Sequence, residues 1–167
     1  MSFVISHLYR DEESQRWVIQ TNADHTEGVA KLASQFASEF GMATWGETLG
    51  LLHDKGKESD AFQQHIKKVS GYEPDCIVKG DTHHAYVGGN LARRIYGQSA
   101  DNFFVNQIVS HHTGLHDYDE IDAILTKEIP PEIDTHIQRN ALDKPPFLAK
   151  SNDLHHFLLI TIGQKSR

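Results

Sequence analysis

Five histidines and one aspartate stand at or near the ends of segments that the sequence predicts to be helical. Imidazole nitrogens and carboxylate oxygens are good ligands for divalent transition metals. A carboxylate flanked by two groups of imidazoles can bridge two metal ions, and such a pair can activate water and bind a phosphate oxygen. The pattern therefore favours a helical fold whose helix ends converge on a metal-dependent phosphohydrolase site. The six residues are His25, His53, Asp54, His84, His111 and His112.

Helix signals punctuate the chain, whereas strand signals are hard to find. A capping box at residues 21–24 predicts a helix that ends at Gly41. Its predicted buried face is the stripe of helically spaced residues His25, Val29, Leu32, Phe36 and Phe40. Further helices are predicted over residues 45–55, 58–69, from 81 or 82 to about 95, from 101 to just before Gly114, 117–126 and 151–162. The expected fold class is all-α, a single-domain helical bundle.

The first two helices place three of these residues at one level of the bundle. His25 falls in the first turn of one helix, and His53 and Asp54 fall in the last turn of the next. Short connections make consecutive helices antiparallel, so these two ends should lie side by side. Lys57, three residues beyond Asp54, can reach the same site as a fixed positive charge.

The fourth and fifth predicted helices repeat this arrangement. His84 opens the fourth helix, and His111 and His112 close the fifth. His84 also lies in register with an apolar stripe, so its side chain should point inward, where metal ligation would satisfy a buried imidazole. The sequence does not decide between His84 and the adjacent His83, so His83 stays open as the ligand in place of His84.

Histidine is abundant in this chain, with twelve copies. A lone histidine on an apolar stripe is more commonly a hydrogen-bonded core residue, so no single one carries the argument. The joint pattern carries the argument, because five inward histidines and a carboxylate at mutually compatible helix ends rarely arise together by chance. The remaining histidines are predicted to be surface or structural: His7, His65, His116, His136, His155 and His156.

Composition permits one soluble domain and excludes several classes. A chain of 167 residues is long enough to bury a sizeable core. No apolar run approaches the roughly 20 residues that cross a bilayer, and residues 1–13 show no secretory signal, so the expected location is cytoplasmic. The formal charge of −7 argues against a protein that coats nucleic acid, which would be basic. Four basic residues, Lys67, Lys68, Arg93 and Arg94, form either a basic rim or solvated helix faces.

Residues 45–62, with the core Leu-Leu-His-Asp-Lys-Gly-Lys, resemble the signature of the HD superfamily of metal phosphohydrolases. The closer resemblance is to the HD nuclease domain of the type I CRISPR-associated helicase-nuclease, and it runs from about residue 6 to residue 118. Two motifs narrow the choice among HD phosphohydrolases to this nuclease domain: Asp-Ala-Phe-Gln at residues 60–63 and Ser-His-His-Thr-Gly-Leu at residues 110–115. The resemblance implies an HD-type helical bundle.

The resemblance also implies how the ligands divide between two metals. One metal takes His25, His53 and Asp54; the other takes Asp54, His84, His111 and His112. Asp54 and Lys57 are the implied catalytic residues. Imidazole with carboxylate suits manganese, iron, cobalt or nickel, with zinc as an alternative.

The C-terminal part of the chain departs from the family's pattern. The family's first metal also uses an aspartate on a late helix, and no aspartate follows Asp153 here. Asp153 lies early for that role. We therefore expect residues 1–167 to be an HD nuclease domain that lacks the C-terminal part of the family's domain. Its first metal site should be only partly occupied, and its activity should be impaired.

The implied activity is a metal-dependent endonuclease that hydrolyses single-stranded DNA in CRISPR interference, an antiviral defence. No Gly-x-x-x-x-Gly-Lys-Ser/Thr phosphate loop occurs in the sequence. The expected partners are therefore a helicase on a separate chain or a missing segment, and an RNA-guided CRISPR surveillance complex, with no membrane. Two alternatives stay open: an HD phosphohydrolase of small nucleotides, and a truncated, poorly active domain that docks on a helicase.

Overall fold

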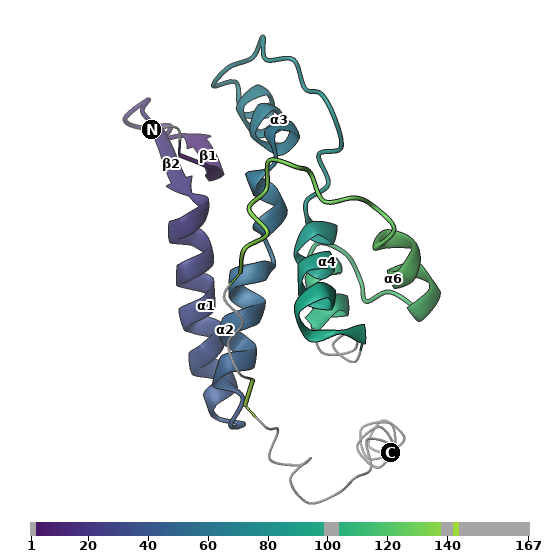
Figure 1. Cartoon of the computed structure of the whole chain (residues 1–167). Coiled ribbons are helices and arrows are strands. Elements are labelled where there is room, and N and C mark those ends of the chain that lie inside the picture. The colour runs from purple at the N-terminus through teal and green to yellow at the C-terminus, as the bar shows by residue number, and fades with distance from the viewer. Residues whose placement is uncertain (1–2, 99–103, 138–141, 144–167) are drawn as a thin grey trace, which may run out of the picture.

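A computed structural model describes residues 3–98, 104–137 and 142–143. Within these residues, helix α1 (Asn22–Ser38) lies beside helix α2 (Ala43–Leu52), and α4 (Ala85–Tyr96) and α6 (Tyr118–Ile124) lie on the other side of α2 (Figure 1). A small hairpin sits beside the N-terminal end of the first helix. In chain order the elements are β1 (Ile5–Arg10), β2 (Trp17–Thr21), α1 (Asn22–Ser38), α2 (Ala43–Leu52), the 3-10 helix η1 (Lys55–Glu58), α3 (Asp60–Ser70), α4 (Ala85–Tyr96), α5 (Asn106–Val109) and α6 (Tyr118–Ile124).

The hairpin corrects the all-α prediction, although the fold is mostly helical. Strands β1 and β2 pair antiparallel, with Leu8 opposite Ile19. A two-stranded hairpin is marginal by itself, and this one gains support from α3. The Gln63 side chain accepts a hydrogen bond from the Ile5 backbone N–H at 2.9 Å and donates one to the Ile5 carbonyl at 2.8 Å. Only Ile5 and Leu8 of β1 contribute buried apolar side chains, so the alternation was too short to reveal a strand.

Helix α1 begins where the sequence predicts. Thr21 is the N-cap, and its hydroxyl oxygen accepts a hydrogen bond from the Asp24 N–H at 3.1 Å. The helix ends at Ser38, and Gly41 follows in the left-handed region with φ of 67°. The prediction of its buried face is wrong, however. Phe36 and Phe40 are 72% and 70% exposed, and Leu32 is also exposed.

The face of α1 that is buried instead carries small residues. Its buried members are Asn22, Thr26 and Ala30, which lie about one residue around the helix from the predicted stripe. The reason is a close approach to α2. A Cβ atom on Gly50 would collide with the backbone of Ala30, so only small residues fit between the two axes. The large apolar side chains are left on the outer face of α1.

The next helices shift slightly against their predicted bounds. Helix α2 ends at Leu52, so His53 is its C-cap and Asp54 lies just beyond it. Helix α3 starts later than predicted, because η1 occupies residues 55–58 and Ser59 caps α3 through the Phe62 N–H. Helix α4 starts at Ala85, with His84 as its N-cap residue, and not at Asp81 or Thr82.

The remaining predictions for helices have mixed outcomes. Helix α5 is a single turn, shorter than the helix predicted from 101 to just before Gly114, and residues 101–103 lie outside the described residues. Helix α6 is confirmed, with a capping box formed by Asp117 and Glu120. The predicted helix over 151–162 lies outside the described residues. In the part of the chain that the structure describes, no helix has the length and apolar character to cross a membrane.

The main hydrophobic core lies around α4, α5 and α6. Phe104 is fully buried and stacks on Trp45 of α2 with ring centroids 4.7 Å apart. The chain after α6 then returns along α2 (Figure 1). Asp143 closes that return, since its backbone N–H donates to the Thr44 hydroxyl at 2.8 Å and its carbonyl accepts from the Trp45 ring at 2.7 Å. The core cluster consists of Leu52, Tyr86, Val87, Leu91, Ala92, Phe104, Val105, Ile108, Val109, Ile121 and Ile133.

Candidate metal centre

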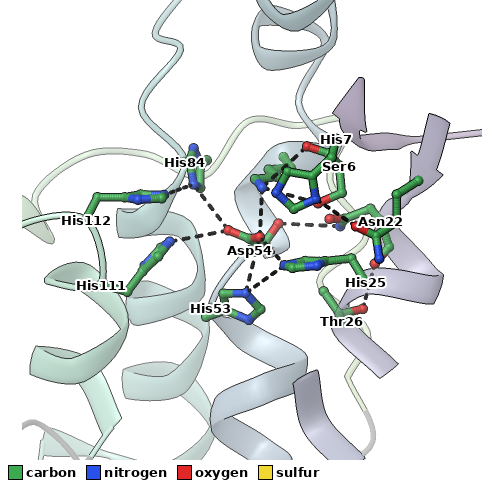
Figure 2. Close-up of polar contacts among 12 residues, drawn as sticks. Ser6, His7, Asn22, His25, Thr26, His53, Asp54, His84, His111 and His112 are labelled. Carbon is green, nitrogen blue, oxygen red and sulfur yellow. Dashed lines mark hydrogen bonds and ion pairs between the residues drawn. The ribbon is translucent and has the colours of Figure 1, made fainter. Parts of the chain in front are cut away.

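All six predicted ligands meet at one place, around the Asp54 carboxylate (Figure 2). Each comes from a helix end, as the antiparallel argument predicted. His25 lies in the first turn of α1 and His53 caps the C-terminus of α2. His84 is the N-cap residue of α4, and His111 and His112 follow Ser110, the C-cap residue of α5.

One oxygen of Asp54 faces the ligands from α1 and α2. Asp54 is 2% exposed. Its Oδ2 atom lies 3.0 Å from Nε2 of His25 and 3.2 Å from Nε2 of His53. The two imidazole nitrogens are themselves 3.2 Å apart. Asp54, His25 and His53 therefore form a compact three-ligand group.

The other oxygen of Asp54 faces the ligands around α4 and α5. Oδ1 lies 3.2 Å from Nε2 of His84 and 3.3 Å from Nε2 of His111. His112 completes this side, with its Nε2 3.0 Å from that of His84. Here four residues each offer a ligand atom, with all four atoms within 4.8 Å of one another. Asp54 belongs to both groups, which is the geometry of a bridging carboxylate.

Two of the imidazoles are held in a fixed orientation by backbone carbonyls. Nδ1 of His53 lies 2.8 Å from the Gly50 carbonyl oxygen, and Nδ1 of His111 lies 2.6 Å from that of Ile108. A carbonyl can only accept, so each Nδ1 carries a proton and each ring turns its Nε2 toward Asp54. Metal-binding histidines are commonly oriented by such a contact to the other ring nitrogen.

This arrangement fits a cation. With the rings neutral and protonated at Nδ1, carboxylate and imidazole lone pairs would face each other across about 3 Å, which is repulsive unless a metal ion or a proton on Nε2 lies between them. Asp54 Oδ1 and His111 Nε2 are accordingly buried without a hydrogen-bond partner among the described residues. A divalent metal on each side of Asp54 would satisfy both atoms, so the donor set fits divalent transition metals.

The site's electrostatics keep Asp54 ionised and favour the neutral, metal-binding form of three of the imidazoles. Burial by itself raises the pKa of Asp54, but the contacts from His111, the other imidazoles and the Lys57 ammonium hold that pKa well below its ordinary range. Burial lowers the pKa of His25 and of His84, and burial likewise lowers the pKa of His112. Burial by itself also lowers the pKa of His111, but its contacts with Asp54 and the Ile108 carbonyl raise that pKa above its ordinary value, so a metal has to displace a proton there. An ionised carboxylate and neutral imidazoles are the states that bind metal.

Lys57 reaches the site as predicted, from η1. Its Nζ lies 2.8 Å from Asp54 Oδ2 and donates to the Ser6 hydroxyl at 3.2 Å. The side chain is buried, and the ammonium lies 5.7 Å from the centroid of the Phe62 ring. Because its contacts lie within the protein, this geometry favours Lys57 as a residue that positions Asp54.

The structure adds neighbours that the sequence did not single out for the site. Ser6 of β1 binds Lys57, and the Asn22 side chain donates to the Asp54 carbonyl at 3.4 Å. His7 packs edge-on against His25, with centroids 4.6 Å apart, and its Nδ1 contacts Gln20 Oε1 at 2.8 Å. Strand β1 was not predicted, so nothing in the sequence placed Ser6 and His7 near Asp54.

A close backbone approach joins the two sides of the site. A Cβ atom on Gly56 of η1 would collide with the backbone of His84. Glycine at this position therefore lets α4 begin directly beside Asp54. Of the two neighbouring histidines, His84 lies in the cluster and His83 does not. Of the four basic residues proposed as a rim, Lys67 pairs with Glu73 and Arg93 pairs with Asp122.

A buried aspartate shared by two groups of histidines at converging helix ends defines a class of helical metal-binding hydrolase domains. The sequence profile of the HD domain matches residues 22–141, and the chain belongs to the HD domain family. Membership implies metal-dependent phosphohydrolase activity in general. No curated protein matches the chain.

Proposed function

We propose that this chain is a metal-dependent nuclease that hydrolyses phosphodiester bonds of single-stranded DNA in CRISPR interference. The observation that carries the proposal is Asp54, which turns one oxygen to each group of imidazoles. That arrangement supports two metals sharing one carboxylate, the kind of site that favours phosphodiester hydrolysis. The motifs at residues 60–63 and 110–115 support the choice of DNA within the HD family.

In this mechanism the protein's part is to hold the metals and the phosphate in place. His25, His53 and Asp54 would hold one metal, and Asp54 with His84, His111 and His112 would hold the other. When bound, the metals would lower the pKa of a water and offset charge on the phosphate oxygens. Lys57 and the Gly50 and Ile108 carbonyls keep the ligands fixed, so little reorganisation is needed during the reaction.

The proposed partners follow from the same resemblance. DNA must be unwound before a single-strand nuclease can act, and the sequence has no phosphate loop of the Gly-x-x-x-x-Gly-Lys-Ser/Thr type. The proposal therefore includes a helicase on another chain or segment, an RNA-guided surveillance complex, and a cytoplasmic location.

A second candidate is an HD phosphohydrolase that acts on small nucleotides. The formal charge of −7 favours it, because a long DNA strand is repelled by net negative charge and a small nucleotide bound at two metals is repelled less. A domain that mainly docks on a helicase is the third candidate, and it predicts little bound metal.

The test is a cleavage assay on the full chain with matched substrates. Circular single-stranded DNA, its double-stranded form and a panel of nucleotides are incubated with manganese, cobalt or nickel. Nicking of the single-stranded circle, abolished by chelator and by Asp54→Asn but not by the exposed control Asp119→Asn, supports the proposal. Turnover of nucleotides but not DNA supports the second candidate. An Asp54→Asn protein that cuts at the wild-type rate removes the proposal.

A further inference from the structure

A cavity of about 460 Å³ opens beside the second group of metal ligands. His84 and His112 form one of its walls, so it is continuous with the metal centre. Its volume lies in the range of pockets that bind small organic ligands. Three further histidines line it, none of which belongs to either metal-ligand group: His65, His83 and His116.

We propose that this cavity binds one nucleoside of the DNA substrate, next to the phosphate held at the second metal. This inference rests on the proposed phosphodiesterase function and assigns a binding role to residues outside the metal ligands. A nucleoside offers a flat aromatic base and polar edges. The cavity offers aromatic and imidazole rings with a cationic group at its edge, which is the combination that single-stranded nucleic-acid sites use.

The inner wall of the cavity is rigid and aromatic. Phe62 is 8% exposed and packs edge-on against His84, with centroids 4.9 Å apart. Tyr86 is buried, and its hydroxyl contacts the Glu128 carbonyl oxygen at 3.4 Å. Both rings are fixed by the fold before a ligand arrives, so binding a base there costs little side-chain ordering.

The outer wall carries the positive charge. Lys127 lies over the Tyr86 ring, 5.1 Å from its centroid, and pairs with Asp81 at 2.7 Å. Its side chain is 43% exposed. It can therefore exchange part of its contact with Asp81 for a phosphate oxygen of a bound strand, without leaving a buried charge unpaired.

The adjacent histidines 83 and 84 divide their roles between the two sites. His84 turns to Asp54, while His83 lines the cavity. The backbone N–H of His83 donates to Asp81 Oδ1 at 2.9 Å, which fixes the chain just before α4. His65 reaches the same cavity from α3. Imidazole rings can both stack on a base and bond its edge, so these positions suit recognition of a base.

The test measures binding separately from catalysis. Wild-type protein and three variants, His65→Trp, His83→Ala and Lys127→Ala, are titrated in the presence of cobalt into a fluorescein-labelled, nuclease-resistant phosphorothioate oligothymidylate. His65→Trp fills the cavity, and the other two remove a ring and a charge. Each should weaken binding by about tenfold, the effect of one stacking contact. The exposed controls His136→Trp and Lys68→Ala should bind like wild type.

Metal content and hydrolysis of methyl p-nitrophenyl phosphate report on the metal centre, since this diester has no nucleoside. Both should be unchanged in the three cavity variants. Variants that bind the oligonucleotide like wild type, or a wild type that does not bind it, would overturn the proposal. A wild type that hydrolyses no diester, while the cavity variants still lose binding, would remove the proposed nuclease function and leave the binding site standing.

Discussion

The two halves of the metal centre rest on very different supports. The half around His25 and His53 is carried by α1 and α2, which approach closely through small residues. The large apolar side chains of α1, such as Phe36, face outward. The half around His84 and His111 is carried by α4 and α5, whose apolar side chains form the main core around the fully buried Phe104.

The comparison shows that the two sites should differ in strength. The half on the main core offers three imidazoles with Asp54, whereas the half on the helix pair offers two. A site gains affinity when its ligands are held in place by packed neighbours. We therefore expect the second metal to bind more tightly, and the first to be the one lost under mild conditions.

The largest expected effect separates core from surface. Phe104→Ala removes a fully buried ring from the core and should cost about 3–5 kcal/mol of unfolding free energy. Phe36→Ala, on the exposed face of α1, should change it by about 0.5 kcal/mol or less. Urea denaturation of both variants measures the difference. Similar losses would mean that the outer face of α1 is covered in the folded protein.

A nearly equal effect is expected from the buried charge that both halves share. Lys57→Met leaves Asp54 buried without its ammonium partner and should destabilise the metal-free protein by about 3 kcal/mol. Lys55→Met breaks a more exposed pair with Glu58 and should cost about 1 kcal/mol or less. Denaturation with and without chelator tests this, and added metal should reduce the loss in the Lys57 variant. If added metal leaves the loss of stability in the Lys57 variant unchanged, this would argue against a metal beside Asp54.

The metal contents of two double variants compare the halves directly. His111→Ala/His112→Ala should lose the tightly bound metal, with an affinity drop of about 100-fold or more. His25→Ala/His53→Ala should keep it and lose only the weaker one. Elemental analysis after gel filtration, followed by calorimetric titration, distinguishes them. Equal metal in wild type and the first variant would contradict the assignment of the second site.

The smallest effect concerns the spacing of α1 and α2. Gly50→Ala places a methyl group against the Ala30 backbone and should cost about 1–3 kcal/mol while moving His25 away from His53. Its metal loss should be confined to the first site. Gly28→Ala is the matched control, because no atom lies within 4 Å of its added methyl group and alanine favours a helix. Loss of both metals from the Gly50 variant would show that the halves are not independent.

The sequence predicted the ligand set and its convergence, because helix caps and the antiparallel rule act over short distances. Thr21 fixes the start of α1, and this start places His25 opposite His53. It did not predict which face of α1 is buried. Two sets of residues on that helix satisfy the same spacing, and hydrophobicity selects Leu32 and Phe36. The set that is buried in the structure is the one that packs against the glycines of α2, and α2 lies elsewhere in the chain.

The sequence also did not predict features that depend on contacts between residues far apart in the chain. The hairpin forms because Gln63 of α3 bonds both backbone groups of Ile5, 58 residues away along the chain. The cavity beside His84 is lined by residues of α3, α4 and the segment after α6, so no local sequence pattern predicts it. His83 and His84 could not be separated by sequence, since adjacent residues before a helix can each turn inward.

The contact between Ser6 and Lys57 has a practical consequence for where this domain can be cut. The family profile begins at residue 22, after the hairpin. A shortened chain that starts there would lose Ser6, His7 and the strand that Gln63 clamps. Lys57, now buried, would face solvent on that side and would be freer to leave Asp54. The functional unit thus extends upstream of the recognisable domain, and fragments trimmed to the profile would misreport its metal affinity.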